Sequence, residues 1–283
     1  MDLILLCTEA SQAAFNVGEF PSGLERIITR GGESSSMPLF FLAKDKAEEN
    51  LFINVRGATI ACDFTRVLNF RHSPFLTGEA HSGVLEAARW IISESRSYIN
   101  EWKGKIICTG HSLGGATSSV IAAILRLEEN RQNVFCIAEA SFPVFTSDIK
   151  ALTEPFTTTL VNNQDVVPLL TQKNIHNFLL KMAPPESRQN LQSAAPMVIQ
   201  LIQQLILGIL SSRGINDPSV VSSIQEKLPA LVLPILQMDA NEKDLFLAGK
   251  VFQVRLTGPK EYQVLPFMEG RSLPDIFSIM FGV

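Results

Sequence analysis

The stretch KIICTGHSLGGATSSVIAAILRLEEN, residues 105–130, decides the fold of this chain. It opens with a β-branched run, passes through a glycine-rich turn, and continues as small and apolar residues that end in charge. This order predicts a strand, a sharp turn and a helix. In the turn, Gly110, Ser112 and Gly114 form the pattern Gly-x-Ser-x-Gly, whose small residues let the chain fold tightly and expose the serine hydroxyl. Ser112 is therefore the candidate nucleophile.

This pentapeptide is informative because of its setting. Glycine and serine are common, so the five residues alone are weak evidence. A strand before them and a small-residue helix after them are the context that the pattern requires. A helix that begins after Ser112 also directs backbone N–H groups and the positive end of its dipole toward an oxyanion.

Strands and helices alternate along the rest of the chain. Apolar runs bounded by turn residues predict strands, and apolar residues at helical spacing predict helices against a sheet. The predicted strands are 39–43, 51–55, 134–138, 157–161 and 250–256, and the predicted helices are 2–16, 83–102 and the one after Ser112. Residues 17–38 are interpreted as packing or cover. The alternation predicts an α/β protein with a mostly parallel sheet, a single domain over residues 1–283.

The composition excludes several classes of protein. Apolar residues make up 46% of the chain and charged residues 18%, which excludes disorder. A formal net charge of −4 without a basic run argues against nucleic-acid binding. The four cysteines lie far apart and away from histidines, so we interpret them as buried free thiols and expect neither a metal site nor a cofactor. The apolar run at residues 3–7 is short and has no basic residue before it, which favours a cytoplasmic location over secretion.

A long apolar insertion precedes the last predicted strand. Residues 172–245 carry prolines between apolar helical runs, of which MVIQLIQQLILGIL (197–210) and KLPALVLPIL (227–236) are the most apolar. The first run is too short to span a bilayer. It carries a narrow polar stripe of Gln200, Gln203, Gln204 and Gly208. Four destinations compete for these helices: the domain core, an acyl-binding lid over Ser112, a membrane surface contacted through 197–236, or an oligomer interface.

Four segments resemble, in order, those of the class 3 lipases, and especially those of the sn-1-specific diacylglycerol lipases. FINVRGAT (52–59) resembles the strand that ends in Arg-Gly-Thr, and AHSGVLEAARWI (80–91) resembles the His-x-Gly helix start. GHSLGG (110–115) resembles the nucleophile turn, and VNNQDVVPLL (161–170) resembles the segment with the catalytic aspartate. The resemblance covers much of residues 51–170 and the tail. It implies an α/β-hydrolase fold with a helical cap over 172–245, and hydrolysis of acylglycerol esters.

The resemblance also assigns roles to single residues. Ser112 takes the place of the nucleophile, Asp165 that of the acid that orients a base, and the N–H groups of Leu113 and Ala58 those of the oxyanion donors. Asp165 follows an apolar strand, as the acid does in α/β hydrolases, although aspartate also caps N–H groups in ordinary loops. His81 and His111 belong to structural segments of the motifs.

The catalytic histidine of the resembling family is missing from its expected place. The family carries it near the C-terminus in Met-x-x-Asp-His-x-Pro-Asp, whereas this chain has MEGRSLPD at 268–275, which puts Ser272 at the histidine position. Serine cannot act as a base near neutral pH. Ala58 also stands where the family has Thr or Ser, so a hydroxyl is lost while the N–H remains. His176, soon after Asp165, is the candidate replacement base, and its alternative is an ordinary histidine at a helix start.

Two functions from different classes therefore compete. The first is serine-dependent hydrolysis of a diacylglycerol or triacylglycerol. The second is a catalytically impaired lipase-like protein that binds lipid or a protein partner through the same pocket, as Ser272 suggests. Thioester or peptide cleavage would suit the same fold, but the apolar insertion argues against peptides.

Overall fold

The computed structural model describes residues 3–14, 20–32, 37–47, 49–59, 63, 71–163, 165, 167–171, 173–174, 176–177, 195–212, 218–236, 243–258 and 261–267. The tail that carries Ser272, part of the 172–245 insertion, and Cys62 lie outside these residues.

An eight-stranded sheet forms the centre of the protein, in the order β1-β2-β3-β6-β7-β8-β9-β10. The five strands β3, β6, β7, β8 and β9 are parallel to one another. β1 and β2 at one edge and β10 at the other are antiparallel additions. The predicted α/β fold with a mostly parallel sheet is confirmed. The strands are β1 Leu24–Arg30, β2 Phe40–Asp45, β3 Asn50–Val55, β6 Lys105–His111, β7 Val134–Glu139, β8 Thr157–Asn162, β9 Lys250–Gly258 and β10 Glu261–Pro266.

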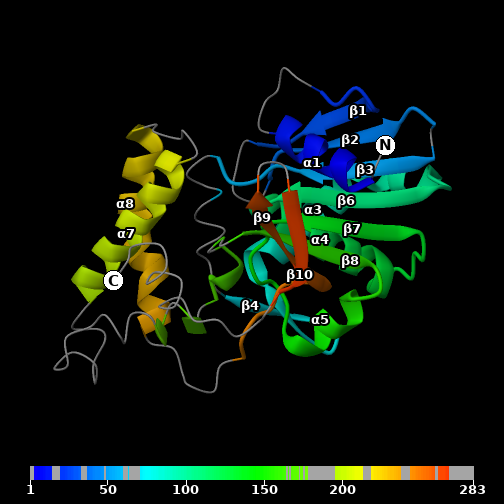
Figure 1. Cartoon of the computed structure of the whole chain (residues 1–283). Coiled ribbons are helices and arrows are strands. Elements are labelled where there is room, and N and C mark those ends of the chain that lie inside the picture. The colour runs from blue at the N-terminus through cyan, green and yellow to red at the C-terminus, as the bar shows by residue number, and fades with distance from the viewer. Residues whose placement is uncertain are drawn as a thin grey trace.

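Helices cover both faces of the sheet (Figure 1). The face toward α3 and α4 carries Ile106 and Cys108, and the face toward α1 carries Ile107, because successive side chains of a strand point to opposite sides. Burial on both faces explains why β6 reads as a continuous apolar run rather than an alternating one. The described helices are α1 Leu3–Ala13, α3 Ser82–Glu101, α4 Leu113–Ala123, α5 Ser147–Thr153, α7 Ala195–Ser212 and α8 Pro218–Leu236, with a π-helical turn at Ile124–Glu128 and a 3₁₀ turn at Val167–Leu169.

A separate hairpin, β4 His72–Phe75 and β5 Gly78–His81, leads directly into α3. The sequence analysis identified neither this hairpin nor β1 nor β10. The three cysteines among the described residues, Cys7, Cys108 and Cys136, are buried and free, as expected. Burial raises the pKa of Cys136 to about 12, so this thiol is not an activated nucleophile.

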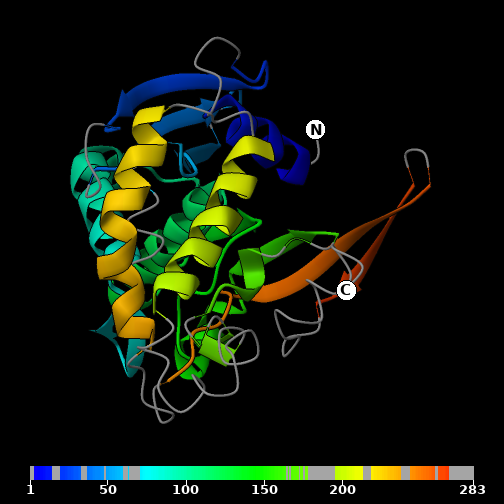
Figure 2. The same cartoon turned by 90° about the vertical axis from the view of Figure 1, so that its left-hand side faces the viewer.

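Helices α7 and α8 pack against each other opposite the carboxyl ends of the parallel strands. In Figure 1 these strands run toward the side on which the helix pair lies, and in Figure 2, seen from that side, the pair lies in front of the sheet. Ile224 and Leu228 of α8 are buried, whereas Gln200, Gln204 and Gly208 of the predicted polar stripe are exposed. No described helix has the length and hydropathy needed to cross a bilayer.

Candidate functional site

Ser112 occupies a strained backbone position at the junction of β6 and α4. Its φ of 57° and ψ of −120° lie outside the regions that L-residues ordinarily adopt. The Ser112 N–H donates to the carbonyl oxygen of Glu139 at 2.8 Å, which ties the turn to the end of the neighbouring strand β7. Such strain persists only where the surroundings hold it, and it gathers at functional sites. The strand–turn–helix prediction is therefore confirmed, with the serine at its sharpest point.

The glycines on either side of Ser112 are required by close backbone approach. A Cβ on Gly114 would lie 2.0 Å from the carbonyl oxygen of Val55, and one on Gly110 would lie 2.5 Å from the same oxygen. Ser112 itself is only 7% exposed. The residue as a whole is enclosed because β7 and the segment after β3 approach the turn from either side, and the accessibility of its hydroxyl stays a prediction.

The two segments that were predicted to hold the oxyanion donors meet at this point. Gly114 in the first turn of α4 lies against the backbone of Val55 and Arg56, where β3 ends. Leu113 begins α4 and is fully buried, and Ala58 follows Arg56 on the neighbouring segment and is also buried. Two backbone N–H groups at such a junction can stabilise a developing oxyanion.

A buried ion pair fixes the segment that carries Ala58. Asp63 Oδ2 accepts the Thr59 N–H at 3.0 Å and lies 3.6 Å from Nη2 of Arg56. The side chains are 16% exposed for Arg56 and 3% for Asp63, so the pair is largely shielded from water. Asp63 thus bridges the residues on both sides of Ala58. The sequence analysis missed this residue, since a lone aspartate between apolar residues gives no local signal.

We expect Asp63→Asn to destabilise the protein strongly. The variant leaves the Arg56 guanidinium buried without its counter-charge, which costs about 3 kcal/mol or more. Urea unfolding measures this loss. The matched control is Glu128→Gln, which breaks the Arg89–Glu128 pair at 2.9 Å, where the Arg89 side chain is 51% exposed. That control should cost less than about 1 kcal/mol. An equal loss of unfolding free energy in the two variants would contradict a stabilising role for the Arg56–Asp63 ion pair, which we call the Arg56–Asp63 clamp.

Asp165 lies on the loop after β8, two strands from β6 in the sheet. Its own N–H donates to the Asn162 carbonyl at 3.0 Å, and its Oδ1 accepts the Val167 N–H at 3.0 Å. The local capping role that was weighed as the alternative is therefore present. It does not exclude catalysis, since a carboxylate oxygen that accepts one N–H has capacity for another donor.

Three of the candidate histidines occupy distinct places in the fold. His81 is buried, and its Nδ1 accepts the Val84 N–H at 3.4 Å as the N-cap of α3, in agreement with its structural interpretation. His111 ends β6 beside Glu139 of β7. His176 is half-buried in the short helical stretch after Thr171.

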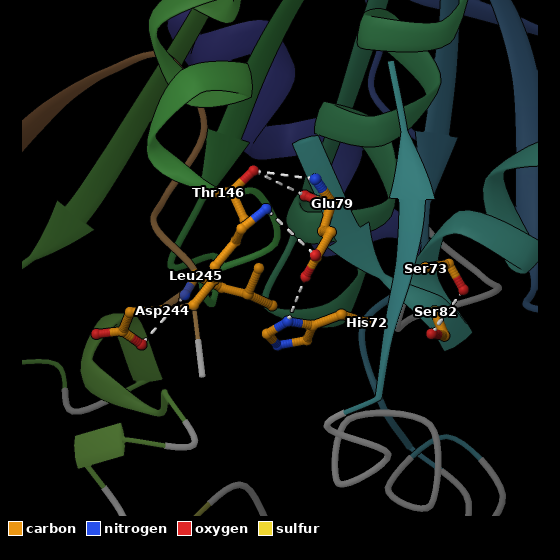
Figure 3. A network of polar contacts seen from close by, with 8 residues as sticks. His72, Ser73, Glu79, Ser82, Thr146, Asp244 and Leu245 are labelled. Carbon is orange, nitrogen blue, oxygen red and sulfur yellow. Dashed lines mark hydrogen bonds and ion pairs between the residues drawn. The ribbon is translucent and has the colours of Figure 1, made fainter. Parts of the chain in front are cut away.

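His72 belongs to a polar network at the exit of the insertion (Figure 3). Its Nδ1 lies 3.1 Å from Oε2 of Glu79, and Lys243 Nζ lies 3.4 Å from the other carboxylate oxygen of Glu79. Burial raises the pKa of the adjacent Asp244, although a hydrogen bond from Thr171 opposes this shift. Thr171 precedes the insertion and Lys243 and Asp244 follow α8, so the network joins both ends of the insertion to the β4–β5 hairpin.

Glu139 is a second carboxylate that the sequence analysis missed. Its Oε1 accepts the Thr8 hydroxyl at 2.7 Å, which attaches α1 to the carboxyl end of β7 beside the Ser112 turn. Burial raises its pKa above that of an ordinary glutamate. Within the described residues, no group of three or more His, Cys, Asp or Glu side chains could hold a metal ion.

Comparison with known proteins finds a match to one family model and to solved structures with a similar fold. Residues 52–175 match the model of the family described as Lipase (class 3). No curated protein sequence matches the chain. A solved triacylglycerol lipase whose catalytic centre is a serine protease triad is 20% identical, with 59% of this chain covering 72% of that one at a TM-score of 0.50. Lipase II from Rhizopus niveus is 17% identical (59% and 71% covered, TM-score 0.49), and a triacylglycerol lipase from Penicillium expansum is 19% identical (59% and 71%, TM-score 0.48). At 20% identity, the likeness to the first of these structures shows a shared fold.

Proposed function

We propose that this protein hydrolyses acylglycerol esters, either diacylglycerol or triacylglycerol, because residues 52–175 match the class 3 lipase model and the chain has an α/β-hydrolase-like fold. The observation that carries the proposal is the backbone of Ser112, held at φ 57° between two glycines that have no room for a side chain. A structural serine would not need this strain.

The proposed reaction follows from the chemistry of such a serine. Ser112 Oγ attacks the acyl carbonyl carbon while its proton passes to an imidazole that Asp165 orients. The N–H groups of Leu113 and Ala58 hold the oxyanion of the tetrahedral intermediate. The protonated imidazole gives its proton to the departing glycerol oxygen. Water, deprotonated by the same base, then releases the fatty acid from the acyl-enzyme.

The base of this proposal is His176. The chain has four histidines. His81 caps α3, His72 pairs with Glu79, and His111 shares its side of the sheet with Glu139, toward α1. His176 follows Asp165 by a short stretch, near the start of the insertion whose helices lie opposite the carboxyl ends of the strands.

A catalytically impaired lipid-binding protein is the second candidate. The sequence favours it through Ser272, which occupies the histidine position of the resembling motif. In that case the fold and the strained turn would be retained, while proton transfer would be lost. The loss of one triad member leaves only residual catalysis.

Hydrolysis assays on diacylglycerol and triacylglycerol distinguish the two candidates. If His176 is the base, the native chain hydrolyses at least one of these substrates, and His176→Gln loses about 10³-fold or more of that rate while the control His72→Gln retains the native rate. An inert native chain that gains activity in Ser272→His would instead establish the impaired lipase. Equal rates for native and His176→Gln would remove His176 from the mechanism.

A further inference from the structure

Strands β9 and β10 form a ribbon that extends past the carboxyl edge of the sheet. One continuous row of paired residues joins His111, Glu139, Leu160 and Phe252, so β9 passes the end of β6 at its third residue. The last pair between β8 and β9 is Asn162 with Val254, and from Arg255 onward β9 pairs with β10 alone. Figure 2 shows the ribbon projecting from the body of the protein.

One face of this ribbon is apolar and exposed. Leu256 pairs with Tyr262 and Val254 with Val264, and these alternate positions share one face. Leu256 is 59% exposed, Tyr262 67% and Val264 61%. Three large apolar side chains this exposed on one short face, next to a candidate site, indicate an interaction surface.

The free edge of the ribbon is poorly suited to an added protein strand. The Phe267 N–H donates to the Val251 carbonyl oxygen at 3.0 Å. Because the N–H groups of an edge strand point alternately toward and away from its partner, those of Gln263 and Leu265 also point toward β9. The outward positions are then Tyr262, Val264 and Pro266, of which Pro266 has no N–H to offer. Proline on an edge strand blocks pairing with a further strand.

The charge of the ribbon complements an anionic surface. Residues 250–267 contain Lys250, Arg255 and Lys260 against a single acid, Glu261, in a chain whose net charge is −4. Arg255 alternates with Leu256, so its side chain lies on the opposite face of this two-stranded ribbon, where its Nε and Nη2 donate to Gln253 Oε1 at 3.1 and 3.0 Å. A tyrosine beside aliphatic residues, on a ribbon whose sequence carries a net positive charge, is a combination found where proteins meet the lipid headgroup region.

We propose that the β9–β10 ribbon docks the protein on anionic membranes, with Leu256, Tyr262 and Val264 entering the headgroup region. The side chain of Gln253 donates to the carbonyl of Asn163, which ties the base of the ribbon to the loop that carries Asp165. A docked ribbon is therefore joined directly to the Asp165 loop at the carboxyl end of β8. Delivery of a lipid substrate to Ser112 rests on the proposed function, whereas docking itself requires no catalysis.

Sedimentation of the full chain with ether-linked lipid vesicles tests the proposal, because these lipids carry no ester to hydrolyse. Vesicles of phosphatidylcholine with phosphatidylserine should bind the native chain, and phosphatidylcholine alone should bind it at least about tenfold less. The double variant Leu256→Ser/Tyr262→Ser should lose about tenfold or more on the anionic vesicles. The matched control is Leu152→Ser, which alters a 44% exposed leucine on α5 and should bind as the native chain does.

Unchanged vesicle binding in the double variant would overturn the proposal and leave a protein as the occupant of this face. Equal binding to both vesicle types would also overturn it, since the basic groups would then have no role. Ser112→Ala should bind as the native chain does. A chain that shows ribbon-dependent binding and hydrolyses no ester would refute the proposed function alone.

Discussion

Ser112→Ala is expected to reduce acylglycerol hydrolysis by about 10³-fold or more, because no other group can form the acyl-enzyme in this mechanism. The residual rate would come from the oxyanion donors and from substrate binding. The loss should appear in kcat rather than in KM, since alanine removes a single hydroxyl from a position that is already enclosed.

The control for this variant is Ser118→Ala on the same helix. The Ser118 hydroxyl is buried and donates to the Thr109 carbonyl at 2.7 Å. Its loss should cost about 1 kcal/mol of stability and leave the activity of the folded protein unchanged. A Ser112→Ala protein that folds and retains native activity would show that the chemistry lies elsewhere.

Gly114→Ala is expected to have the largest effect on stability. The new Cβ would lie 2.0 Å from the Val55 carbonyl oxygen and 2.8 Å from its carbonyl carbon, both of which are backbone atoms that cannot rotate away. The helix or the strand must then shift, at a cost of about 3 kcal/mol, and the shift would move the start of α4 away from the segment that follows β3. The midpoint temperature of thermal unfolding and the rate of hydrolysis should both fall.

Gly208→Ala in α7 is the matched control. A Cβ at Gly208 meets no atom within 4 Å, and alanine is the better helix former by about 1 kcal/mol. This variant should therefore be as stable as the native chain or more stable. A Gly114→Ala protein that unfolds like Gly208→Ala would mean that the close approach at the nucleophile turn is not required.

The sequence predicted those parts of the fold that are buried on both sides. The strands β6 and β7 were recognised because parallel strands between two helical layers read as continuous apolar runs, whereas in β8 buried and partly buried residues alternate. β1 was missed because it pairs only with β2 at the edge of the sheet and is largely exposed, so LERIITR has no clear apolar alternation. β10 was missed for a related reason, since nearly all of EYQVLP is exposed and its partner is another part of the ribbon.

The candidate site was predictable only where it depends on local geometry. Gly110, Ser112 and Gly114 announce a turn within five residues, and the structure confirms it. The Arg56–Asp63 clamp and the Glu139–Thr8 bond join residues that no local pattern connects. The roles of Asp165 and His176 depend on distances across the site, and therefore stay predictions.

The most direct test of the central claim is labelling of the native chain with a fluorophosphonate, followed by peptide mapping of the adduct. The account predicts one covalent adduct, on Ser112, formed by the folded protein and lost when the protein is unfolded before labelling. A folded chain that forms no adduct, or forms it on another serine, would contradict the claim that Ser112 is an activated nucleophile.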